Sequence, residues 1–195
     1  MKDALLIFIK NIEKGKVKTR LAATVGEERA LQIYQALVGH TRKVGLGIDV
    51  TRYLFYSSYL ERDDWSSDDF EKYLQEGKDL GIRMVNAFKK AFEKNEKVII
   101  IGSDCASLTS DILKEAFGLL NNHDFVIGPA QDGGYYLIGM NAFEPSVFEN
   151  MEWSTETVFK KTIEKIKVLN KRYALLPTLS DIDYEEDWLK YGWEI

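Results

Sequence analysis

Short apolar runs rich in β-branched and aromatic residues recur along the chain. Such continuously apolar runs are typical of strands that are covered on both faces, as in a parallel sheet between layers of helices. The most strongly strand-like of them is "KVIIIG", which begins at Lys97. The predicted strands cover residues 4–9, 49–56, 97–102, 124–130, 134–139 and 172–177.

Between these runs, apolar residues recur at the three- and four-residue spacing of a helix that buries one face. The predicted helices cover residues 24–44, 80–93, 109–122, 153–169 and 181–191. Thr24 and Glu27 are expected to form a capping box, Thr109 or its neighbour Ser110 to cap the third helix, and Ser154 to cap the fourth. Residues 57–73 are polar and acidic, which predicts a solvated loop with room for one short helix.

Strands that alternate with helices of ten or more residues predict an α/β fold with helices on both faces of a mostly parallel sheet. Two strands follow each other closely after residue 124, which favours a mixed sheet in a three-layer α/β/α arrangement. A chain of 195 residues is long enough for one sizeable core, so residues 1–195 are expected to form a single domain. In such folds ligands bind at the carboxyl ends of the strands.

The composition of the chain argues against some classes of binding partner and location. The net charge is -5 and the pI is about 5.2, which argues against general binding to nucleic acid, because that requires a basic surface. No apolar run reaches the length of about 18 residues that crosses a membrane. The single cysteine, Cys105, excludes an internal disulfide, so we expect a cytoplasmic protein in which Cys105 is a small packing residue.

A cluster of cations follows the first predicted strand. Lys14, Lys16, Lys18 and Arg20 surround Gly15 within seven residues. Such a loop can hold phosphates, since Arg20 offers a two-pronged donor and Lys18 a mobile point charge. A solvated basic loop is the simpler alternative, because most charge runs are of that kind.

Two acidic segments are expected to meet at the same edge. The strand 97–102 leads to Asp104, whose carboxylate suits Mg²⁺ or Mn²⁺, although capping of the following helix is an equally good explanation. Near the C-terminus, Asp181 and Asp183 lie in "DIDYEED", and they reach the edge where Asp104 lies if the strand that ends at Pro177 is part of the sheet. Carboxylates that share a divalent ion with a diphosphate are sound chemistry for a phosphate site, whereas helix capping is again the alternative.

The segment "GPAQDGGYYLIG", residues 128–139, interrupts an apolar run with Asp132, Gly133 and Gly134. Asp-Gly is a strong hairpin-turn dipeptide, so a simple turn is one reading. Paired glycines also occur where a backbone is approached closely, so the other reading is a ligand site. This stretch by itself does not decide between a simple turn and a ligand site.

With these residues in place, the chain resembles the DUF2064 family, whose members have the GT-A nucleotide-diphospho-sugar transferase fold and are described as transferase 1 of the radical-SAM/selenodomain-associated group. The matching segments are "GKVKTRLA" (15–22), "QEGKDLGIRM" (75–84), "IGSDCASL" (101–108), "GPAQDGGYYLIG" (128–139), "WSTETV" (153–158) and "DIDYEED" (181–187). Ala106 stands where proline is usual after "GSDC", and "NIEKG" lacks the proline usual before the first glycine. Both departures affect loop rigidity and remove no charge.

The resemblance implies particular roles. A nucleotide would lie over Lys18, Thr19 and Arg20, and Asp104 would stand where related folds carry a metal-binding aspartate. It also implies that Gly133 and Gly134 let the backbone pass close to a sugar or acceptor, which Asp132 contacts.

The leading hypothesis is a glycosyltransferase that uses a nucleotide-diphospho-sugar donor, Mg²⁺ or Mn²⁺, and a small-molecule acceptor oriented or deprotonated by Asp132. The alternative is a nucleotidyltransferase that joins an NTP to a phosphorylated small molecule and releases pyrophosphate. A third hypothesis is a binding module that keeps the fold without turnover. The sequence does not determine the base, the sugar, the acceptor or the oligomeric state.

Overall fold

The structure, a computed structural model, describes residues 2–195. Its strands are β1 (Lys2–Ile9), β2 (Thr51–Tyr56), β3 (Glu71–Leu74), β4 (Asn95–Ile101), β5 (Phe125–Pro129), β6 (Tyr135–Met140) and β7 (Tyr173–Leu175). Its helices are α1 (Thr19–Val25), α2 (Glu27–Leu46), α3 (Leu80–Phe92), α4 (Ser110–Leu119), the 3-10 helix η1 (Pro145–Phe148), α5 (Val158–Val168) and α6 (Glu185–Tyr191). Within residues 2–195, none of the helices combines the length and the apolar character needed to cross a bilayer.

The strands form one sheet in the order β3-β2-β1-β4-β6-β5-β7. Strands β3, β2, β1 and β4 run parallel to one another, and β7 is parallel to β5. Strand β6 runs antiparallel to both of its neighbours, β4 and β5. The predicted mixed, mostly parallel sheet is therefore confirmed. Because β6 alone is reversed, its N-terminal end lies at the same edge as the carboxyl ends of the other strands.

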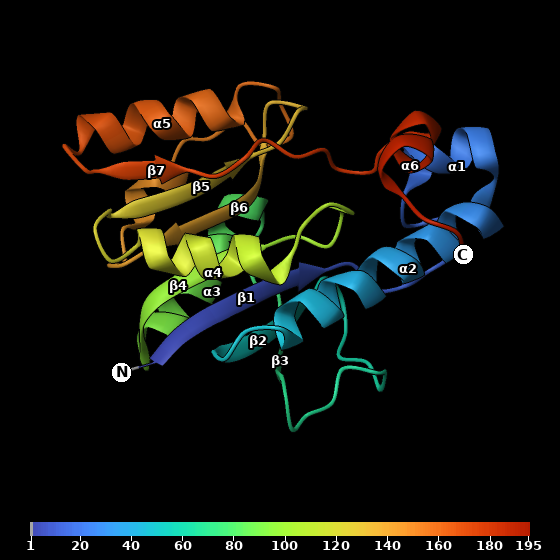
Figure 1. Cartoon of the computed structure of the whole chain (residues 1–195), viewed down its shortest axis with the longest axis horizontal. Coiled ribbons are helices and arrows are strands. Elements are labelled where there is room, and N and C mark those ends of the chain that lie inside the picture. The colour runs from blue at the N-terminus through green and yellow to red at the C-terminus, as the bar shows by residue number, and fades with distance from the viewer. Residues whose placement is uncertain (1) are drawn as a thin grey trace.

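Helices cover both faces of the sheet, which confirms the predicted three-layer arrangement (Figure 1). Alternate residues of β1 point to opposite layers, as the two-residue period of a strand requires. Leu5 and Ile7 pack with α2 and α4 on one face, whereas Ala4 and Leu6 pack with α3 and α5 on the other. All four side chains are fully buried.

A third, smaller core lies beyond the sheet edge. Figure 1 shows α1 and α6 together at one end of the molecule, beside the N-terminal half of α2. Leu21 of α1, Leu37 of α2 and Trp188 of α6 pack in this core with Ile182, which is fully buried. This packing holds the segment before α1 and the segment before α6 close together, although some 160 residues separate them in the sequence.

Two of the predicted helix caps are wrong. Thr24 lies inside α1, where its hydroxyl donates to the carbonyl of Leu21 (3.0 Å), and α2 starts only after Gly26. Gly26 has a φ of 83°, a conformation that ends one helix and starts the next. Ser154 has a φ of 62° and lies in a turn, so α5 begins at Val158. The Thr109 cap is confirmed, since its side chain accepts from the N–H of Ile112 (3.3 Å).

Strand β3 begins within the segment 57–73, which was predicted as a solvated loop. It pairs with β2 at the sheet edge from Glu71 opposite Tyr53 to Leu74 opposite Tyr56. Its ends are exposed and its middle is half-buried, so it lacks the apolar pattern of the inner strands. Edge strands are often short and polar because only one of their sides is paired. Strand β3 forms only because the fold places β2 beside it.

Candidate functional site

Two adjoining cavities open at the edge where β1, β4 and β5 end and β6 begins. The larger has a volume of about 560 Å³ and a largely charged lining, and the smaller one of about 300 Å³ is mostly apolar. Lys10, Tyr34, Asp104, Tyr135 and Asp181 line both, so the two cavities adjoin and together make up the hollow at this edge. The larger cavity also contains Lys18, Thr19, Arg20, Asp132, Gly134 and Asp183.

The predicted cluster of cations divides into two groups. Lys14 and Lys16 pair on the surface with Glu28 (2.7 Å) and Glu13 (2.5 Å). Lys18 instead turns inward, and only 5% of its side chain is exposed. Its ammonium lies 2.7 Å from Asp104 Oδ1 and 3.6 Å from Asp183 Oδ1. The loop is therefore more than a solvated charge run, because the buried Lys18 and the more exposed Lys16 and Arg20 all line the larger cavity.

Thr19 and Arg20 follow Lys18 in the first turn of α1 and line the larger cavity. The guanidinium of Arg20 lies 3.1 Å from Asp183 Oδ2 and remains well exposed. Asp183 therefore contacts both Arg20 and Lys18. An exposed guanidinium with one carboxylate partner keeps donors free for a second anion.

Asp104 lies directly beyond β4, as predicted, and does not cap the next helix. Thr109 provides that cap, so the capping explanation for Asp104 is wrong. The backbone carbonyl of Asp104 accepts a hydrogen bond from the N–H of Ile182 (2.9 Å). This bond ties the acidic segment near the C-terminus to the end of β4. Asp104, Asp181 and Asp183 consequently line one cavity.

The helix-capping role in the acidic segment belongs to Asp187. Its carboxylate accepts from the N–H groups of Asp183 (3.0 Å) and Tyr184 (2.8 Å) at the start of α6. The side chains of Asp181 and Asp183 are thereby left for the cavity. Burial, together with the negative charges of Asp104 and Asp132, raises the pKa of Asp181 to about 7. The carboxylates that gather at this edge therefore carry more negative charge than the single ammonium of Lys18 neutralises.

Asp132 lies in a hairpin that joins β5 to β6, and the hairpin reading of this stretch is confirmed. Asp132 Oδ1 accepts from the N–H of Gly134 (2.8 Å), and the N–H of Ala130 donates to the carbonyl of Gly134 (3.1 Å). The turn nevertheless lines the larger cavity through Asp132 and Gly134. The two readings are compatible, since the turn places Asp132 in the hollow that contains Lys18.

The structure corrects the role given to Gly133. Its φ is 88°, and a Cβ atom there would lie 2.1 Å from the backbone oxygen of Glu156. Its carbonyl also accepts from the N–H of Phe159 at the start of α5 (2.9 Å). The backbone that approaches Gly133 is that of the chain itself, at residues 156–159. Gly134, in contrast, lines the larger cavity, and its contact with a sugar or acceptor stays a prediction.

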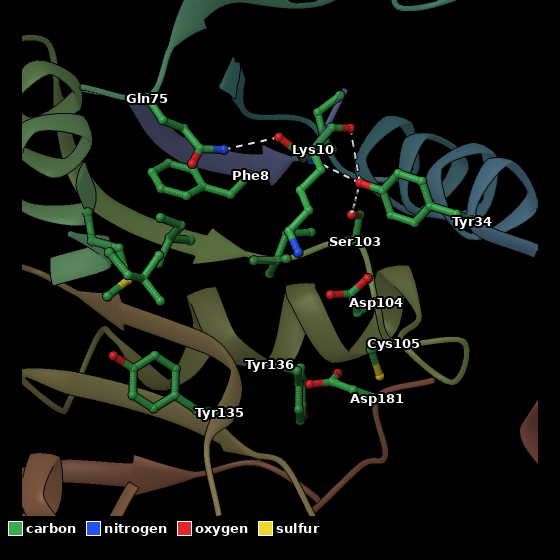
Figure 2. Close-up of a pocket in the computed structure, with 16 residues that line it drawn as sticks. Phe8, Lys10, Tyr34, Gln75, Ser103, Asp104, Cys105, Tyr135, Tyr136 and Asp181 are labelled. Carbon is green, nitrogen blue, oxygen red and sulfur yellow. Dashed lines mark hydrogen bonds between the residues drawn. The ribbon is translucent and has the colours of Figure 1, made fainter. Parts of the chain in front are cut away.

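Several lining residues were not predicted from the sequence. Figure 2 shows the side chain of Lys10, which directly follows β1, pointing into the hollow toward Asp104. The buried hydroxyl of Tyr34 accepts from the N–H of Lys10 (2.8 Å) and lies 3.2 Å from Ser103 Oγ. The position of Lys10 directly after a predicted strand could have identified it as a site residue. The sequence gives no such indication for Tyr34, because its spacing in α2 is that of an ordinary core residue.

Cys105 is buried beside this site, as predicted for a packing residue. Burial raises the pKa of its thiol to about 12, so the thiolate is scarce near neutral pH. A cysteine nucleophile is therefore not favoured.

The chain is similar in sequence and structure to known proteins. Residues 41–155 match the model of a family described as an uncharacterized protein conserved in bacteria, DUF2064. A protein of known structure from Desulfovibrio desulfuricans, provisionally named a nucleotide-diphospho-sugar transferase, is 32% identical to this chain. The similarity covers 94% of this chain and 84% of that one, with a TM-score of 0.86. The chain belongs to the DUF2064 family. None of the curated proteins compared with this DUF2064 chain matches it.

More distant structures share the fold of this DUF2064 protein. Rv0371C from Mycobacterium tuberculosis, solved in complex with manganese, is 10% identical with a TM-score of 0.63, and the similarity covers 100% of both chains. A cytidylyltransferase from Leptospira borgpetersenii is 15% identical with a TM-score of 0.57, covering 98% of this chain and 85% of that one. At these identities the likeness establishes a common fold and no more.

The donor set of the DUF2064 chain suits a hard cation. Asp104 and Asp183 already converge on one positive charge, the ammonium of Lys18. Within residues 2–195, no three carboxylate, imidazole or thiol groups are arranged as a ready cage for an ion. Mg²⁺ ordinarily takes only one or two carboxylates and completes its shell with substrate phosphates and water. Asp104 and Asp183 therefore fit the one or two carboxylates that such an ion takes.

We expect Gly133→Ala to destabilise the fold by more than about 2 kcal/mol, because a side chain there is strained by the positive φ and meets fixed backbone. The matched control is Gly134→Ala. An added Cβ at Gly134 lies 3.1 Å from Asp132 Oδ1, a side-chain atom that is able to move. Urea unfolding of both variants measures the difference. Equal stability of the two variants would contradict the close approach of residue 156.

Asp181 predicts a specific pH dependence of stability. Its pKa of about 7 in the folded chain lies above the value of about 4 for an unfolded aspartate. The stability that this group contributes is therefore full below pH 4 and is lost as the pH rises toward 7. We expect Asp181→Asn to exceed the parent in stability at pH 8 by on the order of 2 kcal/mol, and the gain to vanish near pH 4.

Urea unfolding at the two pH values tests this expectation, with the surface variant Asp68→Asn as control. A gain of the same size at both pH values would show that the carboxyl group of Asp181 titrates normally.

Proposed function

We propose that the chain is a metal-dependent glycosyltransferase that uses a nucleotide-diphospho-sugar donor. The observation that carries the proposal is the cavity in which Lys18 and Arg20 face Asp104 and Asp183, with Asp132 in the same hollow. Cations beside carboxylates that suit a divalent ion are what a departing diphosphate requires. The provisional name of the Desulfovibrio relative supports the same reaction class.

The diphosphate of the donor would lie against the first turn of α1. Lys18 and Arg20 supply charged donors there, and Thr19 a hydroxyl. Asp104 would hold the divalent ion with Asp181 or Asp183 as a second ligand. When bound, the ion neutralises charge that develops on the leaving diphosphate. The manganese in the fold relative Rv0371C makes Mn²⁺ a sensible first choice.

The two parts of the hollow suit the two ends of a nucleotide sugar. Phe8, Met84 and Tyr136 give the smaller cavity apolar walls, which favour the flat faces of a base. Asp132 lies in the larger, polar cavity together with Ser154 and Glu156. There Asp132 would accept a proton from the attacking hydroxyl of a small-molecule acceptor.

A nucleotidyltransferase is the second candidate. The cytidylyltransferase from Leptospira borgpetersenii shares the fold, and the loop of Lys18 to Arg20 would serve the phosphates of an NTP equally well. The two reactions differ in what leaves: a nucleoside diphosphate from a glycosyltransferase, pyrophosphate from a nucleotidyltransferase. A binding module without turnover would release neither.

The test begins with a thermal-shift screen of nucleotides and nucleotide sugars, with and without Mn²⁺, because a ligand that binds only the native state raises its melting temperature. Ligands that bind are then incubated with candidate acceptors, and nucleoside diphosphate and pyrophosphate are measured. Release of nucleoside diphosphate supports the proposal. Pyrophosphate supports the second candidate, and binding without either product supports the binding module.

A further inference from the structure

The side chain of Lys18 occupies the point on which the proposed metal ligands converge. Its ammonium lies 2.7 Å from Asp104 Oδ1 and 3.6 Å from Asp183 Oδ1. The lysine side chain is 5% exposed, whereas those of Asp104 and Asp183 are 44% and 35% exposed. The carboxylates thus remain open to solvent on one side while an internal cation already balances them on the other.

The local backbone places Lys18 in this position. Lys18 has the left-handed conformation, with φ 48° and ψ 44°, immediately before α1. Such a conformation is uncommon for a residue with a side chain and persists only where the surroundings favour it. The neighbouring Lys16 pairs on the surface with Glu13, so the two lysines of the loop point to different partners.

A divalent ion at these carboxylates conflicts with Lys18. The ion either replaces the ammonium or binds within a few ångströms of it, and like charges at that separation repel strongly in a partly buried site. A displaced ammonium also loses its partners, which is costly for a buried charge. Both effects weaken binding of the metal by itself.

A diphosphate removes this conflict, because its oxygens offer the ammonium of Lys18 a new anionic partner. We propose that Lys18 is a built-in counter-ion that holds the divalent metal out of the Asp104–Asp183 pair until a nucleotide diphosphate takes over its ammonium. This inference rests on the proposed function, since it assumes that metal and nucleotide meet at this edge. It adds that the metal binds weakly until the nucleotide arrives.

The consequence is a coupling between the two ligands. Coupling is reciprocal, so nucleotide strengthens metal binding by the same factor by which metal strengthens nucleotide binding. Coordination of phosphate by the ion contributes to that factor in any such site. The share that Lys18 contributes is visible when the lysine is removed and metal binding is measured without nucleotide.

The experiment is calorimetric titration of Mn²⁺ into the parent and into Lys18→Met, both without nucleotide at pH 8. Methionine keeps an unbranched side chain of similar length and removes the charge. We expect Lys18→Met to bind Mn²⁺ roughly tenfold more tightly than the parent, within the usual range of coupling between ligands. Lys14→Met is the matched control, with parent-like Mn²⁺ affinity, because Lys14 pairs with Glu28 on the surface and lies outside both cavities. If Lys18→Met does not fold, as judged by circular dichroism, Lys18→Gln takes its place.

Titrations with a nucleoside diphosphate present complete the test. In the parent the diphosphate should raise Mn²⁺ affinity by a larger factor than in Lys18→Met. Unchanged or weaker Mn²⁺ binding by Lys18→Met without nucleotide overturns the inference, even if the parent proves to be a glycosyltransferase. Tighter Mn²⁺ binding by Lys18→Met upholds it, even if no sugar is transferred, so the proposed function and this inference fail separately.

Discussion

Asp132→Asn is expected to lower turnover with nucleotide sugar and acceptor by about 10²–10⁴-fold, the range that a positioned general base contributes. The amide keeps the shape of the carboxylate and still accepts the hydrogen bond that Asp132 Oδ1 receives from the N–H of Gly134. Asn-Gly is moreover as good a turn dipeptide as Asp-Gly. The hairpin should therefore stay intact, and only the capacity to take up a proton is lost.

Three measurements separate this role from a structural one. Donor affinity and unfolding free energy should match those of the parent, and only kcat should fall. Asp68→Asn, a charge removal at an exposed residue outside the cavity, is the control and should change none of the three. Full activity of Asp132→Asn would contradict the role of Asp132 as a general base and leave the hairpin as a simple turn.

The inner strands were predictable because burial on both faces leaves a clear mark in the sequence. Strands β1 and β4 lie between two helical layers, and both are runs of apolar residues. Strand β3 leaves no such mark, since it lies at the edge with exposed ends. Its formation depends on β2 as a partner, and pairing across the sheet is a property of the assembled fold.

The helix boundaries show a similar division. Thr109 is followed at once by a helix and caps it as predicted. Thr24 has the right residue type and spacing for a cap, but Gly26 breaks the chain into α1 and α2 two residues later. The helical signal ran across this break because both helices bury apolar residues in the same core. The local pattern predicted α2 and missed both the break at Gly26 and most of α1, which begins at Thr19, before the predicted helix start at residue 24.

At the site, the sequence identified which segments meet but not how their side chains pair. Because strand ends gather at one edge of an α/β sheet, Asp104 and the loop of Lys18 were expected near each other. That Lys18 rather than Lys16 turns inward depends on a left-handed residue and on the core between α1 and α6, which brings Asp183 into reach. No local pattern specifies either feature. The same holds for Tyr34, whose hydroxyl joins Lys10 to Ser103 across two strands.

Asp104→Asn is expected to abolish metal-dependent nucleotide binding, with a loss of more than about 100-fold in the affinity measured with Mn²⁺. The amide has the size of the carboxylate and lacks the charge that a divalent ion requires. Helix α4 should be unaffected, because Thr109 and not Asp104 provides its cap. The ammonium of Lys18 would lose its closer partner and retain Asp183 at 3.6 Å.

Calorimetric titration of a nucleotide into parent and variant, with Mn²⁺ present and then chelated, measures this effect. The parent should lose affinity on chelation, whereas Asp104→Asn should bind weakly under both conditions. Asp111→Asn is the matched control, because Asp111 lies in the first turn of α4 as an exposed carboxylate paired with Lys114. A control that behaves like the parent excludes a general effect of lost charge near this helix. If Asp104→Asn binds nucleotide with the same dependence on Mn²⁺ as the parent, the carboxylate that holds the metal must be sought elsewhere in the cavity, first at Asp181.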